Sequence, residues 1–191
     1  MNTDIRDYAR VYKGFLDQDT CITAINQSKN VMFKQHTFYN HERGEHSPMS
    51  GDQELDVFTD NKFDVDISRL IIDKLWNAIK QYTLDVDVPC FNSWDGYSAI
   101  RYNKYVENRK MAIHNDHIKS LFTGEDRGIP VLSCLGALNN DYLGGEFIMW
   151  EKEVIDLRAG DLLIFPSNFL YPHMVAPVKS GTRYSYISWV W

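Results

Sequence analysis

The chain has 191 residues, 44% hydrophobic and 24% charged, a composition typical of one globular domain rather than of a disordered or fibrous chain. Its formal net charge of −6 argues against nonspecific nucleic-acid binding, which depends on Lys and Arg contacts to phosphates. The first 16 residues carry closely spaced charges, and the longest weakly polar run, 129–138, is too short to span a bilayer. Three widely spaced cysteines with no Cys-x-x-Cys pair favour a reducing compartment. We therefore expect a soluble, cytoplasmic protein with no signal peptide and no membrane-spanning segment.

Two amphipathic helices are predicted in the first half. In the first helix, Asp17 or Asp19 caps the N-terminus, and one face carries Cys21, Ile22 and Ile25. The second starts near Asp66 or Ser68, and its apolar residues follow three-and-four spacing: Ile67, Leu70, Ile71, Leu75, Ala78, Ile79 and Tyr82. Between the helices, the polar segment 36–60 is predicted to be a loop, which could close over a substrate.

After Pro89 the sequence changes to short β-type runs separated by Gly- and Asp-rich turns. The predicted strands are 97–102, 110–114, 131–138, 146–150, 162–165, 173–178 and 182–190. Such a series without intervening helices predicts a mainly β jelly roll, buttressed by the two N-terminal helices. We expect one domain over 1–191, in which 1–90 supplies helical support and the polar loop and 91–191 forms the jelly-roll core.

A candidate metal site begins with His114 and Asp116 at the end of a predicted strand. Residues at i and i+2 of a strand share a face, so the imidazole and the carboxylate can occupy adjacent positions around one ion. His173, at the start of a later strand, would complete a set of two histidines and one carboxylate. That set leaves three positions open on an octahedral metal and suits Fe(II), a bidentate 2-oxo acid and O₂.

Two polar residues follow His173 on one further strand. Arg183 could clamp the far carboxylate of a 2-oxo acid bidentately, and Ser185, on the same strand face, could add a hydroxyl donor. A buried cation without such a role would be costly, which favours a ligand-binding function for Arg183.

From about Ser98 to Trp191 the chain resembles the Fe(II)/2-oxoglutarate-dependent dioxygenases, specifically the prolyl 4-hydroxylase group. The matching segments are Arg101-Tyr102, His114-x-Asp116, Leu138-Asn139, Gly144-Gly145-Glu146, 159–166 (AGDLLIFP), Pro172-His173-x-Val175-x-Pro177, and 181–185 (GTRYS) through Trp189. The resemblance implies a double-stranded β-helix in which His114, Asp116 and His173 bind iron and Arg183 pairs with the 5-carboxylate of 2-oxoglutarate. Ala137 stands where many relatives have a tyrosine that bonds this carboxylate, so we expect Tyr102 to supply the hydroxyl, with Ser185 beside it.

By this resemblance the chain is expected to hydroxylate an unactivated C–H bond, with a prolyl residue of a peptide or protein as substrate. Fe(II) is the implied cofactor, 2-oxoglutarate and O₂ the co-substrates, and ascorbate a candidate reductant; no catalytic residue beyond the metal ligands is implied. Asp116 argues against the halogenating branch, which lacks this carboxylate. No nucleic-acid or membrane partner is expected.

Other interpretations remain open at this point. A hydroxylase of a free amino acid or other small molecule would use the same iron site, and a cupin-like binding module would explain the strands alone. A nucleic-acid demethylase would carry a second functional arginine after Arg183, which the chain lacks. We expect the remaining histidines not to bind the metal: His117 is predicted to lie at the surface or to support the site, and the polar segment holds His36, His41 and His46. A basic cluster is predicted to form a solvated rim; it comprises Arg101, Lys104, Arg109, Lys110 and Lys119.

Overall fold

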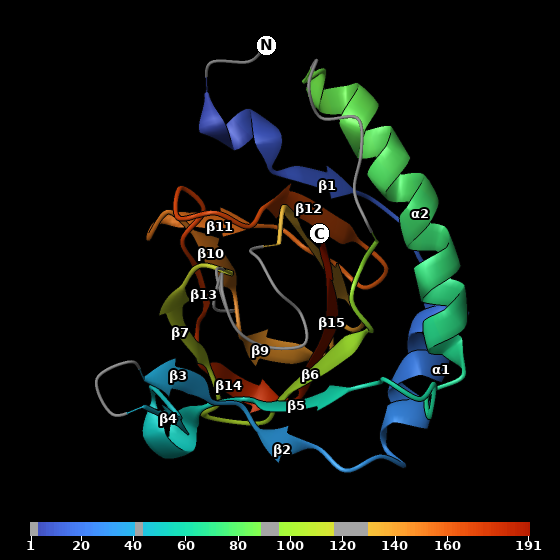
Figure 1. The fold of residues 1–191 in the computed structure, drawn as a ribbon. Coiled ribbons are helices and arrows are strands. Elements are labelled where there is room, and N and C mark those ends of the chain that lie inside the picture. Colours follow the sequence, from blue (N-terminus) through green and yellow to red (C-terminus); the bar gives the residue numbers. More distant parts are fainter. Residues whose placement is uncertain (1–3, 41–43, 89–95, 117–129) are drawn as a thin grey trace.

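A seven-stranded antiparallel sheet is the largest layer of the structure, a computed structural model that describes residues 4–40, 44–88, 96–116 and 130–191. We call it the main sheet (Figure 1). In spatial order its strands are β1 (Arg10–Tyr12), β12 (Leu162–Pro166), β8 (Leu132–Ala137), β15 (Arg183–Val190), β6 (Arg101–Tyr105), β5 (Asp56–Thr59) and β2 (Lys34–Gln35). Strands that are neighbours in this order lie far apart in the chain, as in a jelly roll.

A second, four-stranded sheet lies against the main sheet. Its order is β11 (Glu153–Ile155), β10 (Phe147–Met149), β13 (His173–Val175) and β7 (Met111–His114). Two small sheets pair β14 (Val178–Gly181) with β9 (Tyr142–Gly144), and β3 (Phe38–Asn40) with β4 (Glu45–Ser47). An apolar cluster joins the two larger sheets, with Leu135 and Leu163 from one and Phe147 and Val175 from the other. The predicted mainly β jelly roll with flanking helices is confirmed.

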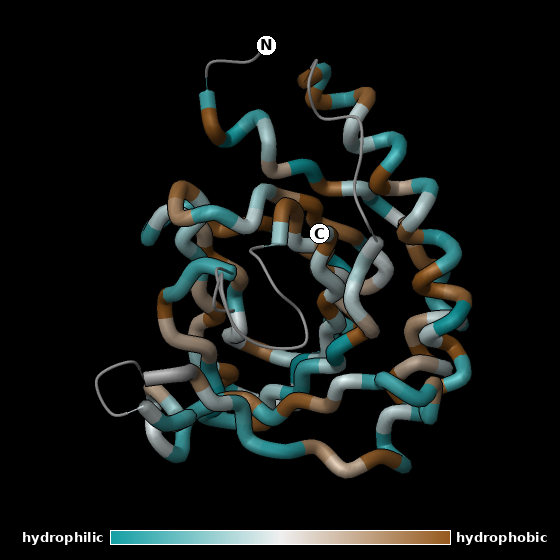
Figure 2. The backbone as a smooth tube through the Cα atoms, viewed as in Figure 1, coloured by the Kyte–Doolittle hydropathy of each residue, from teal (hydrophilic) through white to brown (hydrophobic). Residues whose placement is uncertain are grey.

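Helices cover the other face of the main sheet. Two α-helices, α1 (Gln18–Ser28) and α2 (Ile67–Val86), are accompanied by two 3-10 turns, η1 (Ile5–Tyr8) and η2 (Gly51–Gln53). Apolar and polar residues alternate along α2 (Figure 2), and its Ile71, Leu75 and Ile79 are fully buried against the sheet. Within the described residues, no helix is long and apolar enough to cross a membrane.

The starts of both helices refine the predictions. Asp17 is the N-cap of α1, and its carboxylate accepts a hydrogen bond from the Thr20 amide at 2.7 Å. Cys21 is buried as expected, but Ile22 is 47% exposed, so the predicted apolar face of α1 is wrong at that position. In α2 the N-cap Asp66 makes no side-chain capping bond.

Alternation along the main-sheet strands decides which residues reach the interior between the sheets. In β8, Cys134 packs toward the helices, whereas Leu135 packs toward the second sheet. In β6 the same rule sends Tyr102 toward the helices and Tyr105 into the interior. Every residue of β8 is buried because both faces are covered, so its sequence is continuously apolar or small.

The first half of the chain does more than buttress the jelly roll. β1, β2 and β5 all belong to the main sheet, so 1–90 is not the helical support and loop that we predicted. The polar segment 36–60 contains β5, whose residues from Asp56 to Thr59 pair with β6. These strands are short and rich in polar residues, so they lack the alternation that reveals a strand in sequence.

Predicted strands of the second half are present, with shifted bounds. The run 97–102 is replaced by β6, which starts later, and 173–178 divides into β13 and β14. β9 and β11, of three residues each, were not predicted. Strands this short give too few alternating positions to be distinguished from turns.

Candidate metal and co-substrate site

Two histidines and an aspartate meet at the paired ends of β7 and β13. His173 lies directly opposite His114 in the antiparallel register, and Asp116 follows β7 by two residues. The Oδ1 atom of Asp116 is 3.5 Å from Nε2 of His114 and 3.7 Å from Nε2 of His173. One potential ligand atom from each residue falls within 4.8 Å of the others. The structure therefore brings together the three residues that the sequence nominated.

Hydrogen bonds fix how both imidazoles face this group. Nδ1 of His114 lies 2.8 Å from the carbonyl oxygen of Ala112, and Nδ1 of His173 lies 3.0 Å from that of Tyr171. A carbonyl only accepts, so each Nδ1 carries a proton, and in a neutral imidazole of this tautomer the free lone pair is on Nε2. This is the tautomer that a metal-binding histidine needs.

The charge states of the group also suit a divalent cation. Burial lowers the pKa of His173 to about 4, and the neighbouring His114 acts in the same direction. Burial alone would raise the pKa of Asp116, but His173, His114 and Ser133 together hold it well below its usual range. At neutral pH the site thus offers a neutral His173 and an ionised carboxylate, and metal ligation requires exactly these unprotonated forms.

Two serines hold the carboxylate in place. The Ser133 hydroxyl, on β8, donates to Oδ2 of Asp116, and lies 2.8 Å from the Ser167 hydroxyl. Oδ1 is left facing the histidines. Three phenylalanine rings enclose the imidazoles: Phe38 near His114, and Phe147 and Phe165 near His173.

We expect Ser133→Ala to weaken metal binding about 10- to 100-fold, because the carboxylate would lose the bond that orients it. Co(II) titration followed by its visible absorbance would measure the affinity. Ser98→Ala, which alters a serine outside the strands whose hydroxyl donates to the Ala99 carbonyl, is the control. An unchanged Co(II) affinity in Ser133→Ala would contradict this role.

A buried cation, Arg183, lies at the start of β15, whereas Ser133, which bonds the metal-site carboxylate, pairs with Trp189 near the end of this strand. Arg183 is 2% exposed; Nη1 donates to the Ser185 hydroxyl at 3.0 Å, and the guanidinium carbon lies 5.0 Å from the centre of the Tyr105 ring. Asn103 donates to the same hydroxyl at 3.4 Å. Among the described residues Arg183 has no ion pair with an acidic side chain. Its charge is therefore available for an anionic ligand.

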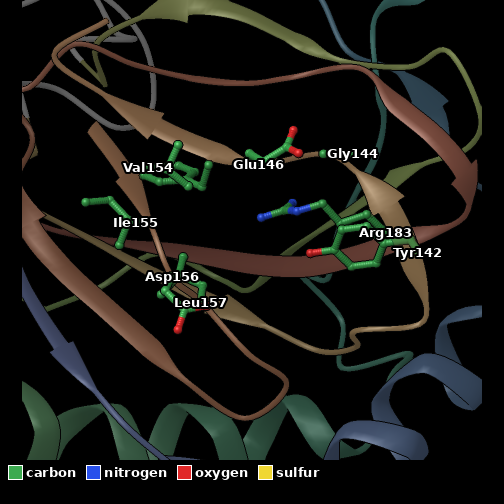
Figure 3. Close-up of a pocket in the computed structure, with 10 residues that line it drawn as sticks. Tyr142, Gly144, Glu146, Val154, Ile155, Asp156, Leu157 and Arg183 are labelled. Atoms are coloured by element: carbon green, nitrogen blue, oxygen red, sulfur yellow. The ribbon is translucent and has the colours of Figure 1, made fainter. Parts of the chain in front are cut away.

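Arg183 also lines a pocket of about 180 Å³ between β9, β10 and β11. In Figure 3 its guanidinium points into this pocket toward Val154 and Ile155. Gly145 forms the adjoining turn at φ +65°, where a Cβ atom would lie 3.1 Å from Cδ of Arg183. Only glycine suits this conformation and this close approach, so the Gly144-Gly145 turn helps to position the arginine.

Tyr102 does not join the group, contrary to our prediction. Its hydroxyl lies on the helix side of the main sheet, 2.8 Å from the Ser68 hydroxyl of α2, which donates to Asp60. Tyr105 lies beside Arg183 instead, directly opposite it in the β6–β15 register. Because 102 and 105 differ by an odd number, these two tyrosines face opposite sides of β6, so at most one of them can lie beside Arg183. The register with β15 decides that it is Tyr105.

We expect Tyr102→Phe to lower the free energy of unfolding by about 1 kcal/mol, because it removes one buried hydrogen bond. The variant should bind 2-oxo acids as the unaltered chain does. Urea unfolding and a 2-oxoglutarate titration would measure the two properties. A large loss of 2-oxoglutarate affinity without loss of stability would restore Tyr102 to the site.

The other histidines and the basic residues divide among several surroundings. His36 is buried and its ring lies 4.5 Å from that of Phe38, whereas His46 is exposed; His41, His117, Lys119 and Cys90 lie outside the described residues. Our prediction that Arg101 belongs to a solvated rim is wrong, because Arg101 is half-buried and lies over Trp189. Arg109 donates to the Glu54 carbonyl, and Lys104 lies over Phe33.

Comparisons with known proteins agree with this geometry. Residues 100–191 match the family model of the 2OG-Fe(II) oxygenase superfamily. A PKHD-type hydroxylase from Xylella fastidiosa strain M12 is 39% identical over 100 residues, and one from Idiomarina loihiensis is 31% identical over 96. These matches cover 47% and 49% of this chain, but only 43% and 42% of the relatives. The matched part thus spans less than half the length of either hydroxylase.

Solved structures share the fold along nearly the whole chain. A Trichoplax adhaerens prolyl hydroxylase, solved with a hypoxia inducible factor peptide fragment, superposes with a TM-score of 0.69 at 16% identity, over 97% of this chain and 84% of that one. A Pseudomonas putida prolyl-4-hydroxylase gives a TM-score of 0.61 at 19% identity, over 96% and 91%. At these identities the likeness concerns the fold.

Proposed function

Because residues 100–191 match the family model of the 2OG-Fe(II) oxygenase superfamily, we propose that the chain is an Fe(II)- and 2-oxoglutarate-dependent dioxygenase that hydroxylates an unactivated C–H bond. The observation that carries this proposal is the pairing of a buried His-Asp-His group with a separate buried arginine that has no acidic partner in the described part of the chain. We further propose that 1–191 act as one domain, since both halves contribute strands to the main sheet.

The donor set fits Fe(II). His114, Asp116 and His173 would hold the ion through two Nε2 atoms and Oδ1, leaving positions for a 2-oxo acid and O₂. When bound, iron would activate O₂, one atom of which goes into succinate as 2-oxoglutarate loses CO₂ and the other into the hydroxylated substrate.

The residues around iron would bind, orient and exclude water. Arg183 would hold the far carboxylate of 2-oxoglutarate, with Ser185 fixing its guanidinium and Tyr105 covering it. Ser133 would orient Asp116, and the three phenylalanine rings would keep the histidines dry. No side chain need act as a general acid or base, so the chain contributes geometry and charge.

A prolyl residue of a peptide or protein is the substrate we propose to test first. Support comes from the prolyl hydroxylases that share the fold, one of them holding a peptide, and from the PKHD-type hydroxylases that match in sequence. A free amino acid or other small molecule is the alternative substrate. Ascorbate would serve to keep the iron reduced.

The test is succinate formation from 2-oxoglutarate under air, with and without Fe(II), in the absence of any added substrate. We expect slow, iron-dependent succinate and an anaerobic charge-transfer absorbance when Fe(II) and 2-oxoglutarate are added together. Proline-containing peptides and free amino acids would then be screened for stimulation of succinate release. If neither signal appeared, the dioxygenase proposal would fail and a cupin-like binding module would take its place.

A further inference from the structure

A second arginine enters the interior between the sheets, on the same strand face as Tyr105. One face of β6 carries Arg101, Asn103 and Tyr105, whereas Tyr102 lies on the opposite face and packs toward the helices. Tyr105 lies opposite Arg183, whereas Arg101, four residues earlier on β6, lies opposite Ile187. The two arginines therefore occupy different levels of the main sheet.

Arg101 lies at the level of the metal group. Its guanidinium carbon is 4.8 Å from the centre of the Trp189 ring. Trp189 is the register partner of Ser133, which bonds the Asp116 carboxylate. Consistent with this position, the charge of Asp116 opposes the lowering of the Arg101 pKa by burial. Arg101 thus lies near the His-Asp-His group, at a different level of the sheet from the arginine that would bind 2-oxoglutarate.

Arg101 has donors to spare. Its Nε donates to Oδ1 of Asn103 at 3.1 Å, and among the described residues it has no ion pair with a carboxylate. The stacked Trp189 adds a further unused donor, since its buried Nε1 has no hydrogen-bond partner in the part of the chain that the structure describes. A half-buried guanidinium next to an orphaned N–H is a polar arrangement that lacks an acceptor.

Charge balance indicates what kind of acceptor is missing. In the loaded site the charges of Fe(II), Asp116, dianionic 2-oxoglutarate and Arg183 cancel. Arg101 then leaves one uncompensated positive charge in a region walled by aromatic rings. The buried Glu54 forms no ion pair with Arg101 in the described part of the chain: its carboxylate accepts from the Ser50 amide and lies 4.0 Å from Nδ1 of His36.

We propose that Arg101, stacked on Trp189, binds a carboxylate of the substrate and so selects molecules that carry this group close to the hydroxylated carbon. A planar guanidinium pairs bidentately with a carboxylate, and the pair both neutralises the charge and orients the substrate. The inference rests on the proposed dioxygenase function and narrows its substrate class. The carboxylate belongs to a free amino acid, to a peptide C-terminus or to an acidic side chain beside the reacting residue.

Matched ligand pairs that differ only in this charge test the proposal. L-proline is compared with L-prolinamide, a peptide ending in proline with its C-terminal amide, and a Pro-Asp peptide with its Pro-Asn counterpart. Titration calorimetry of anaerobic protein loaded with Fe(II) and 2-oxoglutarate would give each affinity. We expect at least one carboxylate to bind tenfold or more tightly than its neutral partner, and the pair concerned identifies the source of the carboxylate.

Arg101→Gln should abolish that preference while the neutral member of the pair keeps its affinity. Arg158→Gln, which changes an exposed arginine paired with Asp156, should leave the preference intact. Equal affinities within every pair, absence of binding by all of them, or equal weakening of both members in Arg101→Gln would overturn the proposal. Failure of the proposed function would show separately, as absence of iron-dependent succinate, since the calorimetric preference does not require turnover.

Discussion

Replacing His114 with alanine is expected to abolish iron-dependent succinate formation, with a loss of metal affinity of more than about 100-fold. The substitution removes one of three ligand atoms and also the ring packed against Phe38 and His173. Succinate release under air, measured with saturating 2-oxoglutarate, gives the activity. A second readout covers the case in which the variant is merely less stable.

That second readout is the effect of metal on unfolding. A ligand that binds only the native state raises the melting temperature in proportion to its affinity, so Co(II) should stabilise the unaltered chain but not His114→Ala. His46→Ala, which changes an exposed histidine on β4, should retain both the activity and the Co(II) effect. A Co(II)-stabilised His114→Ala that still formed succinate would remove His114 from the metal site.

Replacing Arg183 with glutamine is expected to raise the KM for 2-oxoglutarate about 30-fold or more, because truncating one partner of a buried charge pair costs about 2–5 kcal/mol. The charge is held on one strand face by Ser185 and Tyr105, and a glutamine there would carry no charge for the far carboxylate. The unaltered chain should strongly prefer 2-oxoglutarate to 2-oxopentanoate, which lacks the far carboxylate.

In Arg183→Gln this preference should collapse, which a general loss of folding would not produce. Arg158→Gln serves again as the control on an exposed arginine. A variant that kept the preference for 2-oxoglutarate would show that the far carboxylate is bound elsewhere, and Arg101 would be the next residue to change.

The sequence predicted that His114 and Asp116 act together because their spacing carries a geometric rule. His114 and Asp116 share a strand face by the period of two, and the resemblance linked them to His173 and Arg183 across the chain. The longer strands β8 and β15 were predicted for a different reason: burial on both faces favours apolar, aromatic and small residues along nearly the whole strand.

What the sequence did not show depends on pairing between distant segments. Tyr105 reaches Arg183 only through the β6–β15 register, and Arg101 reaches the metal level by the same register. Neither contact is encoded by local spacing, so Tyr102 was nominated in place of Tyr105. β5 was missed because its stability comes from pairing with β6 rather than from apolar alternation.

The main sheet is held together by pairs between strands that are far apart in the sequence. Arg10 pairs with Ile164, and the strand that contains Arg183 lies between β6 and β8. Such pairing gives a high contact order, and chains of this kind fold slowly because long loops must close before contacts repay the cost. His114 and His173 meet only when β7 has paired with β13, so we expect the His-Asp-His group to form late in folding. Bound iron would then lower the rate of unfolding, while the rate of folding would stay that of the metal-free chain.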